Sequence, residues 1–206
     1  MPMNQIVCFG DSITAGKSVP DIRRWTSLLQ IALDVRQDGP WAVYGRGVPG
    51  ETVVEGLERF DKDVASLLPA VVLIEFGLND CSHRPGRMIP RVGLDEFEAG
   101  LCEVVRLVRS GGGLAVLLTN HRVDPDRVEE TSGLRFLDKL APYQSVIRAT
   151  AESEEVPLID VEAGFAELTD QKSALSTDGI HLSIEGHTHY AEIVFARLTP
   201  HLPSSQ

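Results

Sequence analysis

The sequence contains few cysteines, and their spacing supports neither a disulfide framework nor a zinc site. Its three cysteines cannot all pair with one another, and none forms a C-x-x-C motif. We therefore expect reduced thiols. Cys8 and Cys102 fall in apolar patterns and are expected in the core, whereas Cys81 follows a polar turn pair and is expected to be accessible.

The sequence also lacks an excess of positive charge and any long apolar segment. It has 19 Lys and Arg against 30 Asp and Glu, a net charge of −11, which argues against a nucleic-acid partner. The longest apolar run, residues 67–74, is eight residues long and contains a proline, whereas a membrane span needs about 18. No basic residue precedes Lys17, so we expect no secretory signal and a cytoplasmic location. These absences leave a small molecule as the expected partner, with the oligomeric state open.

The apolar patterning predicts one domain over residues 1–206 with a doubly wound α/β fold. Short apolar runs bounded by turn residues predict five strands, at residues 6–9, 41–44, 71–76, 114–119 and 157–160. Apolar residues at helical spacing lie between and after them, at residues 25–33, 53–68, 94–108, 134–147 and 184–198. Strands that are apolar on both faces and alternate with helices predict a central parallel sheet covered on both sides.

Several residues mark where the expected helices begin and end. Thr52 and Glu55 have the spacing of a capping box, and Ser183 is a candidate N-cap for the last helix. The glycines at 111–113 are expected to end the third helix. Pro142 is expected to start a helix rather than to end a domain.

Ligands of such sheets bind beyond the carboxyl ends of the strands, so the residues that follow each strand are the candidates for chemistry. Residues 10–18, GDSITAGKS, allow two interpretations. Ser12 could be a nucleophile, or Gly16-Lys17-Ser18 could belong to a phosphate-binding loop. That loop requires glycine where this sequence has Asp11, and it runs straight into a helix, which Pro20 disfavours. We therefore favour the nucleophile.

A catalytic serine needs a base, an acid that orients the base, and hydrogen-bond donors for the oxyanion. The sequence offers two candidates for each of the first two roles. His121 and His181 could each be the base, and Asp160 and Asp178 could each be the acid. Spacing slightly favours Asp178 and His181, because one glycine-containing turn could bring the two side chains together. The G-x-S-x-G elbow of α/β-hydrolases is missing around Ser12.

Four separated segments, taken together and in order, resemble the blocks of the SGNH hydrolases, also called GDSL esterases and lipases. Gly10-Asp11-Ser12-Ile13 resembles the first block, and Gly50 matches the glycine of the second. Gly77-Leu78-Asn79-Asp80 resembles the G-x-N-D block, and Asp178 to His181 the D-x-x-H block. The resemblance implies a three-layer α/β/α sandwich with about five parallel strands, in agreement with the patterning above.

The resemblance also implies roles for individual residues. Ser12 would be the nucleophile, His181 the general base and then acid, and Asp178 the group that fixes the imidazole tautomer. The backbone N–H groups of Ser12 and Gly50 and the side-chain amide of Asn79 would form the oxyanion hole. No metal or organic cofactor is implied.

Each of these positions also has a simpler structural explanation. Ser12 could only cap a helix, Gly50 could only permit a tight turn, and the Asn79-Asp80 pair could only form one. His181 could be a solvent-facing histidine. His121 would lie near the site, as a supporting or substrate-contacting residue.

The two loops at residues 81–93 and 121–133 are long, so we expect them to shape the substrate pocket. The first contains Arg84, Arg87 and Arg91 and no acidic residue, which suggests an anionic substrate or leaving group; solvated loop charge is the alternative. The expected activity is hydrolysis of small carboxylic esters through an acyl-enzyme on Ser12. An acyltransferase or sugar O-acetyl esterase with the same triad, and a non-catalytic binding module, are the alternatives.

Overall fold

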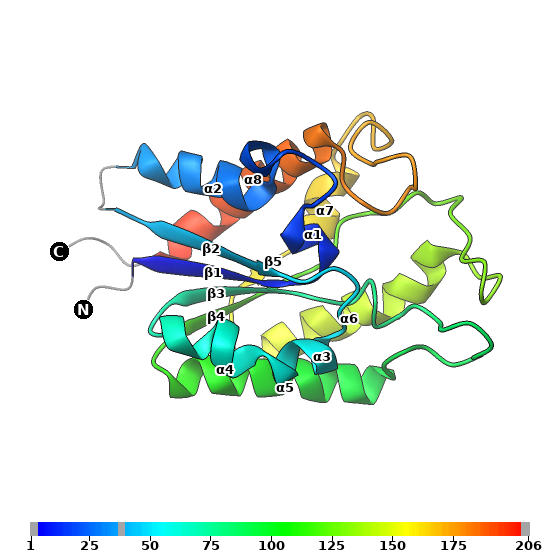
Figure 1. The fold of residues 1–206 in the computed structure, drawn as a ribbon, viewed down its shortest axis with the longest axis horizontal. Helices are drawn as coiled ribbons and strands as arrows, with labels where there is room; N and C mark the ends of the chain where they lie inside the picture. The colour runs from blue at the N-terminus through cyan, green and yellow to red at the C-terminus, as the bar shows by residue number, and fades with distance from the viewer. Residues whose placement is uncertain (1–3, 37–39, 203–206) are drawn as a thin grey trace.

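The computed structural model describes residues 4–36 and 40–202, and its centre is a five-stranded sheet of parallel strands. The strands lie in the order β2-β1-β3-β4-β5 (Figure 1). Their bounds are Gln5–Gly10 for β1, Ala42–Gly47 for β2, Val71–Glu75 for β3, Leu114–Leu118 for β4 and Leu158–Ile159 for β5. The five strands expected from the sequence are confirmed, each within three residues at either end.

Helices cover both faces of the sheet and make three layers (Figure 1). One face carries α2 (Trp25–Asp34), α7 (Val161–Ala166) and α8 (Ile184–Leu198). The other carries α3 (Val53–Glu58), α4 (Phe60–Asp63), α5 (Leu94–Ser110) and α6 (Phe136–Ser153). The short helix α1 (Ser12–Ala15) follows β1, and single 3-10 turns lie at Asp21–Arg23, Ala65–Leu67 and Thr199–His201.

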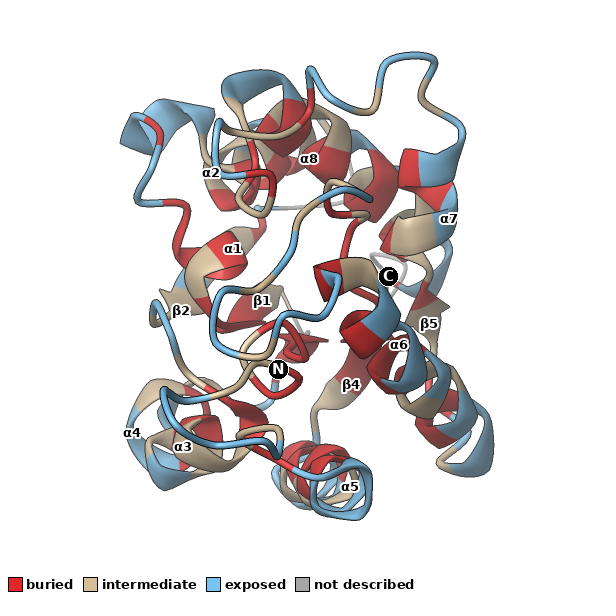
Figure 2. Cartoon of the chain, turned by 90° about the vertical axis from the view of Figure 1, so that its right-hand side faces the viewer, coloured by how far each residue is buried: buried red, intermediate tan, exposed pale blue. Residues whose placement is uncertain are grey.

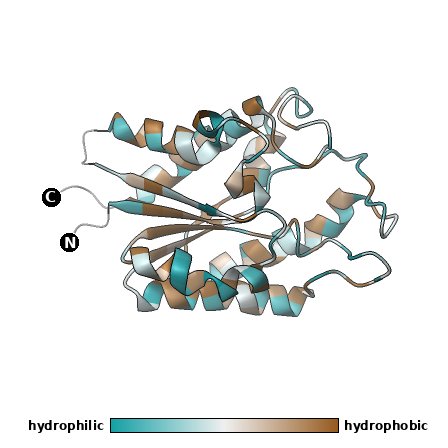
Figure 3. Cartoon of the chain, in the orientation of Figure 1, coloured by the Kyte–Doolittle hydropathy of each residue, from teal (hydrophilic) through white to brown (hydrophobic). Residues whose placement is uncertain are grey.

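Burial on both faces explains why the strands are apolar throughout. Every residue of β3 is buried, as are all of β1 after Gln5, and Figure 3 shows these strands as the most hydrophobic part of the chain. The helices show the complementary pattern, with buried inner faces and exposed outer faces (Figure 2). The expected doubly wound fold is thus confirmed. None of the helices within the described ranges is long and apolar enough to cross a membrane.

The helix ends expected at Thr52, Ser183 and Gly111 are confirmed. Thr52 and Glu55 form a complete capping box at the start of α3, and the Ser183 side chain accepts from the Gly186 N–H at the start of α8. Gly111 caps the end of α5. The segment 53–68, expected as one helix, is instead broken into α3, α4 and a 3-10 turn.

Three other expectations were wrong. Pro142 lies inside α6, six residues after its start, because α6 begins at Phe136. Cys81 is buried, with 1% of its surface exposed, because the loop after it folds back over the Asp80 turn. Cys102 is only partly buried, whereas Cys8 lies in the core as expected. Burial raises the pKa of the Cys81 thiol to about 12, so this thiol is not a reactive group.

Candidate active site

Ser12 is the first residue of α1 and directly follows β1. Asp11 is the N-cap of this helix, because its side chain accepts a hydrogen bond from the Ile13 N–H at 2.9 Å. The simpler explanation of Ser12 as a helix cap is therefore wrong. The Ser12 Oγ lies 3.0 Å from Nε2 of His181, which comes from a turn 169 residues later in the chain.

The Asp178–His181 turn presents the imidazole to Ser12 in a fixed orientation. Asp178 Oδ2 lies 2.6 Å from His181 Nδ1, and Asp178 Oδ1 accepts from the N–H groups of Ile180 and His181 at 2.8 and 2.9 Å. Gly179 has a φ of +72°, a conformation that glycine adopts without strain, and it allows the chain to turn back between the two side chains.

Hydrogen bonds keep the Asp178 carboxyl ionised. Partial burial tends to raise its pKa, but bonds from His181, Ile180 and Ser176 outweigh burial and hold the pKa well below its ordinary value. An ionised Asp178 accepts the hydrogen on Nδ1, which leaves Nε2 of a neutral His181 free to accept the Ser12 proton.

The other candidate base and acid lie elsewhere. His121 is fully buried behind the turn, and its Nε2 lies 2.7 Å from the Ile180 carbonyl oxygen. Because the ring has no exposed surface, the expectation that His121 contacts substrate was wrong; burial also lowers its pKa to about 4. Asp160 caps α7 and binds Arg148 at 2.9 Å.

Gly50 lies at the tip of a tight turn beyond β2. The Glu51 N–H donates to the Val48 carbonyl at 3.3 Å, with Pro49 and Gly50 between them, and Gly50 has a φ of +84°. This combination is that of a type II turn, which requires glycine at its third position. Among the described residues, no protein acceptor binds the backbone N–H of Gly50 or of Ser12.

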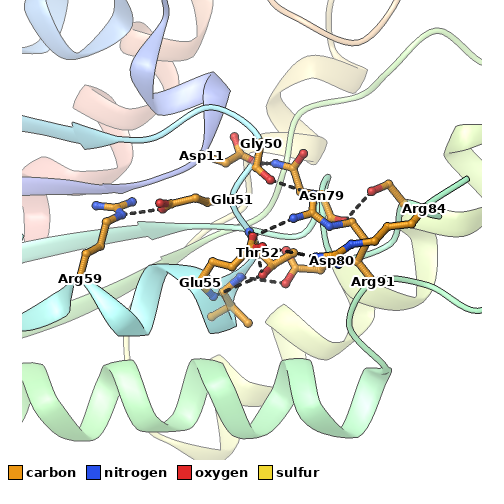
Figure 4. Close-up of polar contacts among 12 residues, drawn as sticks. Asp11, Gly50, Glu51, Thr52, Glu55, Arg59, Asn79, Asp80, Arg84 and Arg91 are labelled. Carbon is orange, nitrogen blue, oxygen red and sulfur yellow. Dashed lines mark hydrogen bonds and ion pairs between the residues drawn. The ribbon is translucent and has the colours of Figure 1, made fainter.

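Asn79 lies beyond β3, and its side-chain amide is held by the residue next to Ser12. Its Nδ2 donates to Asp11 Oδ2 at 2.8 Å, which uses one of its two N–H bonds (Figure 4). The second N–H bond is thereby aimed by Asp11. The geometry places one candidate oxyanion donor on each of the loops after β1, β2 and β3.

Asp80 connects the Gly50 and Asn79 loops and is more than a turn-forming residue. Its Oδ1 accepts from the Val53 N–H at the start of α3, and its Oδ2 accepts from the Gly77 N–H, both at 2.9 Å. The side chain is fully buried, and this burial raises its pKa to about 7. Asp80 therefore fixes the distance between two loops that are far apart in the sequence.

A pair of buried carboxyls lies beneath the nucleophile. Asp11 and Glu75 hydrogen-bond to each other, and Glu75 also accepts from Thr14 Oγ1 at 3.0 Å and from Asn120 Nδ2 at 2.8 Å. Burial raises the pKa of Asp11 to about 6 and that of Glu75 well above its ordinary value. Since a hydrogen bond between two carboxyls needs a proton, the pair carries one at neutral pH.

The loop arginines are placed differently from one another. Arg91 is bound to the Gly50 carbonyl and to Glu55, and only 15% of its side chain is exposed. Arg84 lies 3.6 Å from Glu55 and is 68% exposed, and Arg87 is exposed. With Ile89 and Pro90 the three line a cavity of about 230 Å³.

A buried ionic cluster joins the two long loops. Glu129 of the second loop accepts from the His83 N–H at 2.9 Å, and its carboxylate lies 2.9 Å from the His83 ring and 2.7 Å from Lys139 Nζ. These contacts tie the two loops to each other. No group of three or more metal-ligating side chains capable of holding an ion was found within residues 4–36 and 40–202.

Sequence reasoning missed the buried carboxyls of Glu75 and Asp11. The signal for Glu75 was a charged residue near the end of an otherwise apolar strand, because a carboxyl at such a position must find a partner or a proton. Asp11 was read only as part of the first block. Its contact with Asn79 joins residues 68 positions apart and has no local signature.

The buried pair predicts an unusual pH dependence of stability. Carboxyls whose pKa is raised in the folded state stabilise it most below their unfolded value, near pH 4, and lose that contribution as pH rises through the folded values. The folded pKa is about 6 for Asp11, and that of Glu75 lies well above its ordinary value. Glu75→Gln supplies a permanent donor to Asp11, so the variant should match wild type at pH 5 and melt higher at pH 9, by about 3 °C or more.

Thermal unfolding followed by circular dichroism at both pH values measures this difference. Glu103→Gln, which changes an exposed carboxyl on α5, is the control and should show the same offset from wild type at both pH values. A pH-independent offset for Glu75→Gln would mean that the pair does not lose a proton between these two pH values.

Comparisons with known proteins show which enzymes this chain resembles. The chain is 27% identical to an arylesterase from Vibrio mimicus over 96% of its own length and 90% of that protein. Its fold is similar to that of a lipase/acylhydrolase from Enterococcus faecalis, with a TM-score of 0.81 at 23% identity, covering 99% and 100% of the two chains. Axe2, an acetylxylan esterase from Geobacillus stearothermophilus, gives a TM-score of 0.80 at 23% identity, covering 96% and 94%.

A sequence model of the GDSL-like lipase/acylhydrolase family matches residues 8–189, a span that includes all four blocks quoted from the sequence. The chain belongs to the GDSL-like lipase/acylhydrolase family and is a carboxylic ester hydrolase.

Proposed function

We propose that the protein hydrolyses small carboxylic esters through an acyl-enzyme on Ser12, with His181 as general base and acid and Asp178 as its orienting carboxylate. The observation that carries this proposal is the continuous contact from Ser12 Oγ to His181 Nε2, at 3.0 Å, and from His181 Nδ1 to Asp178, at 2.6 Å. Nucleophile, base and orienting acid in this geometry constitute a serine triad.

The reaction proceeds by two acyl transfers. Ser12 Oγ attacks the ester carbonyl while its proton passes to His181 Nε2; the tetrahedral intermediate then collapses, and the alcohol leaves with that proton. Water next attacks the acyl-enzyme, giving its proton to His181, and the acid is released as the proton returns to Ser12. The ionised Asp178 stabilises the imidazolium in both halves.

The backbone N–H groups of Ser12 and Gly50 and the Asn79 amide are the proposed oxyanion donors. The two backbone groups have no competing acceptor among the described residues, and Asp11 holds the amide. A donor of this kind lowers the barrier by about 3 to 4 kcal/mol.

Two relatives suggest substrate classes for this chain. An arylesterase and an acetylxylan esterase are among the proteins that it resembles, so aryl acetates and O-acetylated sugars are the first substrates to screen. An acyltransferase would use the same triad with a sugar hydroxyl in place of water, and product analysis with and without an acceptor separates the two. A non-catalytic binding module is disfavoured because Ser12 and His181 are already in reactive contact.

Labelling with a fluorophosphonate tests the nucleophile. Intact-protein mass should show one adduct on wild type and none on Ser12→Ala, and the variant should lose turnover of p-nitrophenyl acetate by about 10⁴-fold or more. A folded wild type with neither adduct nor turnover would contradict the proposed function.

Two alanine variants test the choice of base. We expect His181→Ala to lose about 10⁴-fold in kcat. His121→Ala should lose far less, because His121 is buried and contacts the turn at the Ile180 carbonyl rather than Ser12. Initial rates on p-nitrophenyl acetate, with melting temperatures as the folding check, make the comparison. The reverse order of losses would assign the base to His121.

Arg84 and Arg87 are the proposed contacts for an anionic group on the substrate, because they are exposed and line the cavity beside the bound Arg91. Replacing both with alanine should raise KM for mono-p-nitrophenyl succinate about fivefold, since an exposed ion pair contributes up to about 1 kcal/mol. KM for the neutral p-nitrophenyl acetate should stay within twofold. Equal changes for both esters would mean that these charges are only solvated. Arg106→Ala, on α5, is the control for loss of a surface arginine.

A further inference from the structure

Arg91 lies between the loop that shapes the pocket and the turn that carries Gly50. Its Nη1 donates to the Gly50 carbonyl at 2.8 Å, and its Nη2 donates to Glu55 Oε2 at 2.7 Å. Figure 4 shows the side chain reaching from its loop across to Gly50 and Glu55. Because both terminal nitrogens of the guanidinium bind groups of the protein, the side chain is not free to bind a substrate.

We infer that Arg91 is a positioning residue, which holds the Gly50 turn so that the Gly50 N–H points at the oxyanion. This inference rests on the proposed function, because it assumes that Gly50 is an oxyanion donor. It revises the sequence-based expectation for Arg91, which grouped it with Arg84 and Arg87 as a substrate contact.

The ends of the Gly50 turn are held, because the Val48 N–H donates to the Gly10 carbonyl at 3.0 Å and Glu51 binds Arg59 at 2.5 Å. The tip of the turn has little besides Arg91 to hold it. A side chain at Gly50 would meet no atom within 4 Å, so the tip of the turn is not packed. The turn's own hydrogen bond, from the Glu51 N–H to the Val48 carbonyl, is long at 3.3 Å. Because glycine rotates freely about φ and ψ, an unheld tip would sample several orientations of its peptide groups. Arg91 fixes the peptide that follows Gly50, and Pro49 fixes the φ angle before it.

Arg91 can act as a fixed support because both of its ends are anchored. Its own N–H donates to the Ser82 carbonyl at 2.8 Å, and the next N–H, of Val92, donates to the Asp80 carbonyl at 3.2 Å. The Val92 carbonyl accepts from the buried Tyr143 hydroxyl. The backbone of Arg91 is therefore tied to the same Asp80 turn that carries Asn79.

Glu55, the partner at the other end, is also held. The same Oε2 atom that binds Arg91 accepts from the Thr52 N–H at 2.9 Å as part of the capping box of α3. Arg91 thus connects the Gly50 carbonyl to two fixed points, namely the Asp80 turn and the start of α3. Because Glu55 balances its charge, the effect of Arg91 on the oxyanion is one of position rather than of net positive potential.

A lysine cannot replace Arg91 in this role. The guanidinium binds Gly50 and Glu55 through two separate nitrogens in a planar fork, whereas an ammonium is a single point of charge on a flexible stem. The conservative variant Arg91→Lys therefore separates position from charge, and Arg91→Ala removes both.

The experiment compares Arg91→Ala, Arg91→Lys and Arg106→Ala with wild type on p-nitrophenyl acetate, a neutral ester. We expect Arg91→Ala to lower kcat about 30-fold or more with KM within twofold, a smaller loss than the 10²- to 10³-fold for removal of a donor itself. Arg91→Lys should also lose at least about tenfold. Arg106→Ala, which removes an exposed arginine bound only to Glu103, should match wild type.

Chemical rescue distinguishes positioning from a general loss of structure. Methylguanidine at about 50 mM should restore part of the kcat of Arg91→Ala and none of the activity of Ser12→Ala. If Arg91→Ala unfolds, Arg91→Lys carries the test, because it retains the stem and the charge.

Two results would overturn the inference while leaving the proposed function intact. One is a Ser12-dependent wild-type activity with kcat unchanged in Arg91→Ala. The other is a rise in KM for the neutral ester at constant kcat, which would make Arg91 a substrate contact. Absence of Ser12-dependent activity in wild type would instead contradict the proposed function.

Discussion

The position of β1 between β2 and β3 determines where the candidate site forms. Gly10 at the end of β1 pairs with Gly47 of β2 on one side and with Glu75 of β3 on the other. The three loops that carry Ser12, Gly50 and Asn79 therefore leave the sheet at one level and side by side. The connection from β1 leads to β2 on one side of it, and the following connection crosses back to β3 on the other side. Ligands of doubly wound sheets bind in the crevice at the point where the strand order reverses in this way. Only the Asp178–His181 turn has to be brought from elsewhere.

Placing the loops side by side is not enough for catalysis, because each hydrogen-bond donor must also point in the correct direction. Here the support comes from buried ionisable groups rather than from apolar packing. Asp11 aims Asn79, Asp80 ties the Asn79 loop to α3, and Arg91 holds Gly50. Burying these groups costs stability, and the raised pKa values of Asp11 and Asp80 are a sign of that cost. In return the hydrogen bonds restrict Asn79 and Gly50 in direction, which apolar contacts cannot do.

Local sequence signals were enough to predict the strands, most helix ends and the approach of Asp178 to His181. Strands that are apolar on both faces, the Thr52 capping box and the Asp178 turn each depend on residues a few positions apart. What could not be predicted depends on contacts between distant residues. The burial of Cys81 and the roles of Glu75 and Arg91 follow only once separate loops meet, and the place of Pro142 inside α6 follows from a helix start that has no side-chain cap. His121 was placed near the site correctly, but only the structure shows that it lies behind the Asp178 turn.

The loop at residues 81–93 both lines a cavity and binds the Gly50 turn. Its tip carries the exposed Arg87, whereas its base carries Arg91, bound to the Gly50 turn. Glu129 ties the same loop to the second long loop through His83. A substitution at the tip leaves the contacts of Arg91 with Gly50 and Glu55 in place, whereas a substitution of Arg91 at the base removes both.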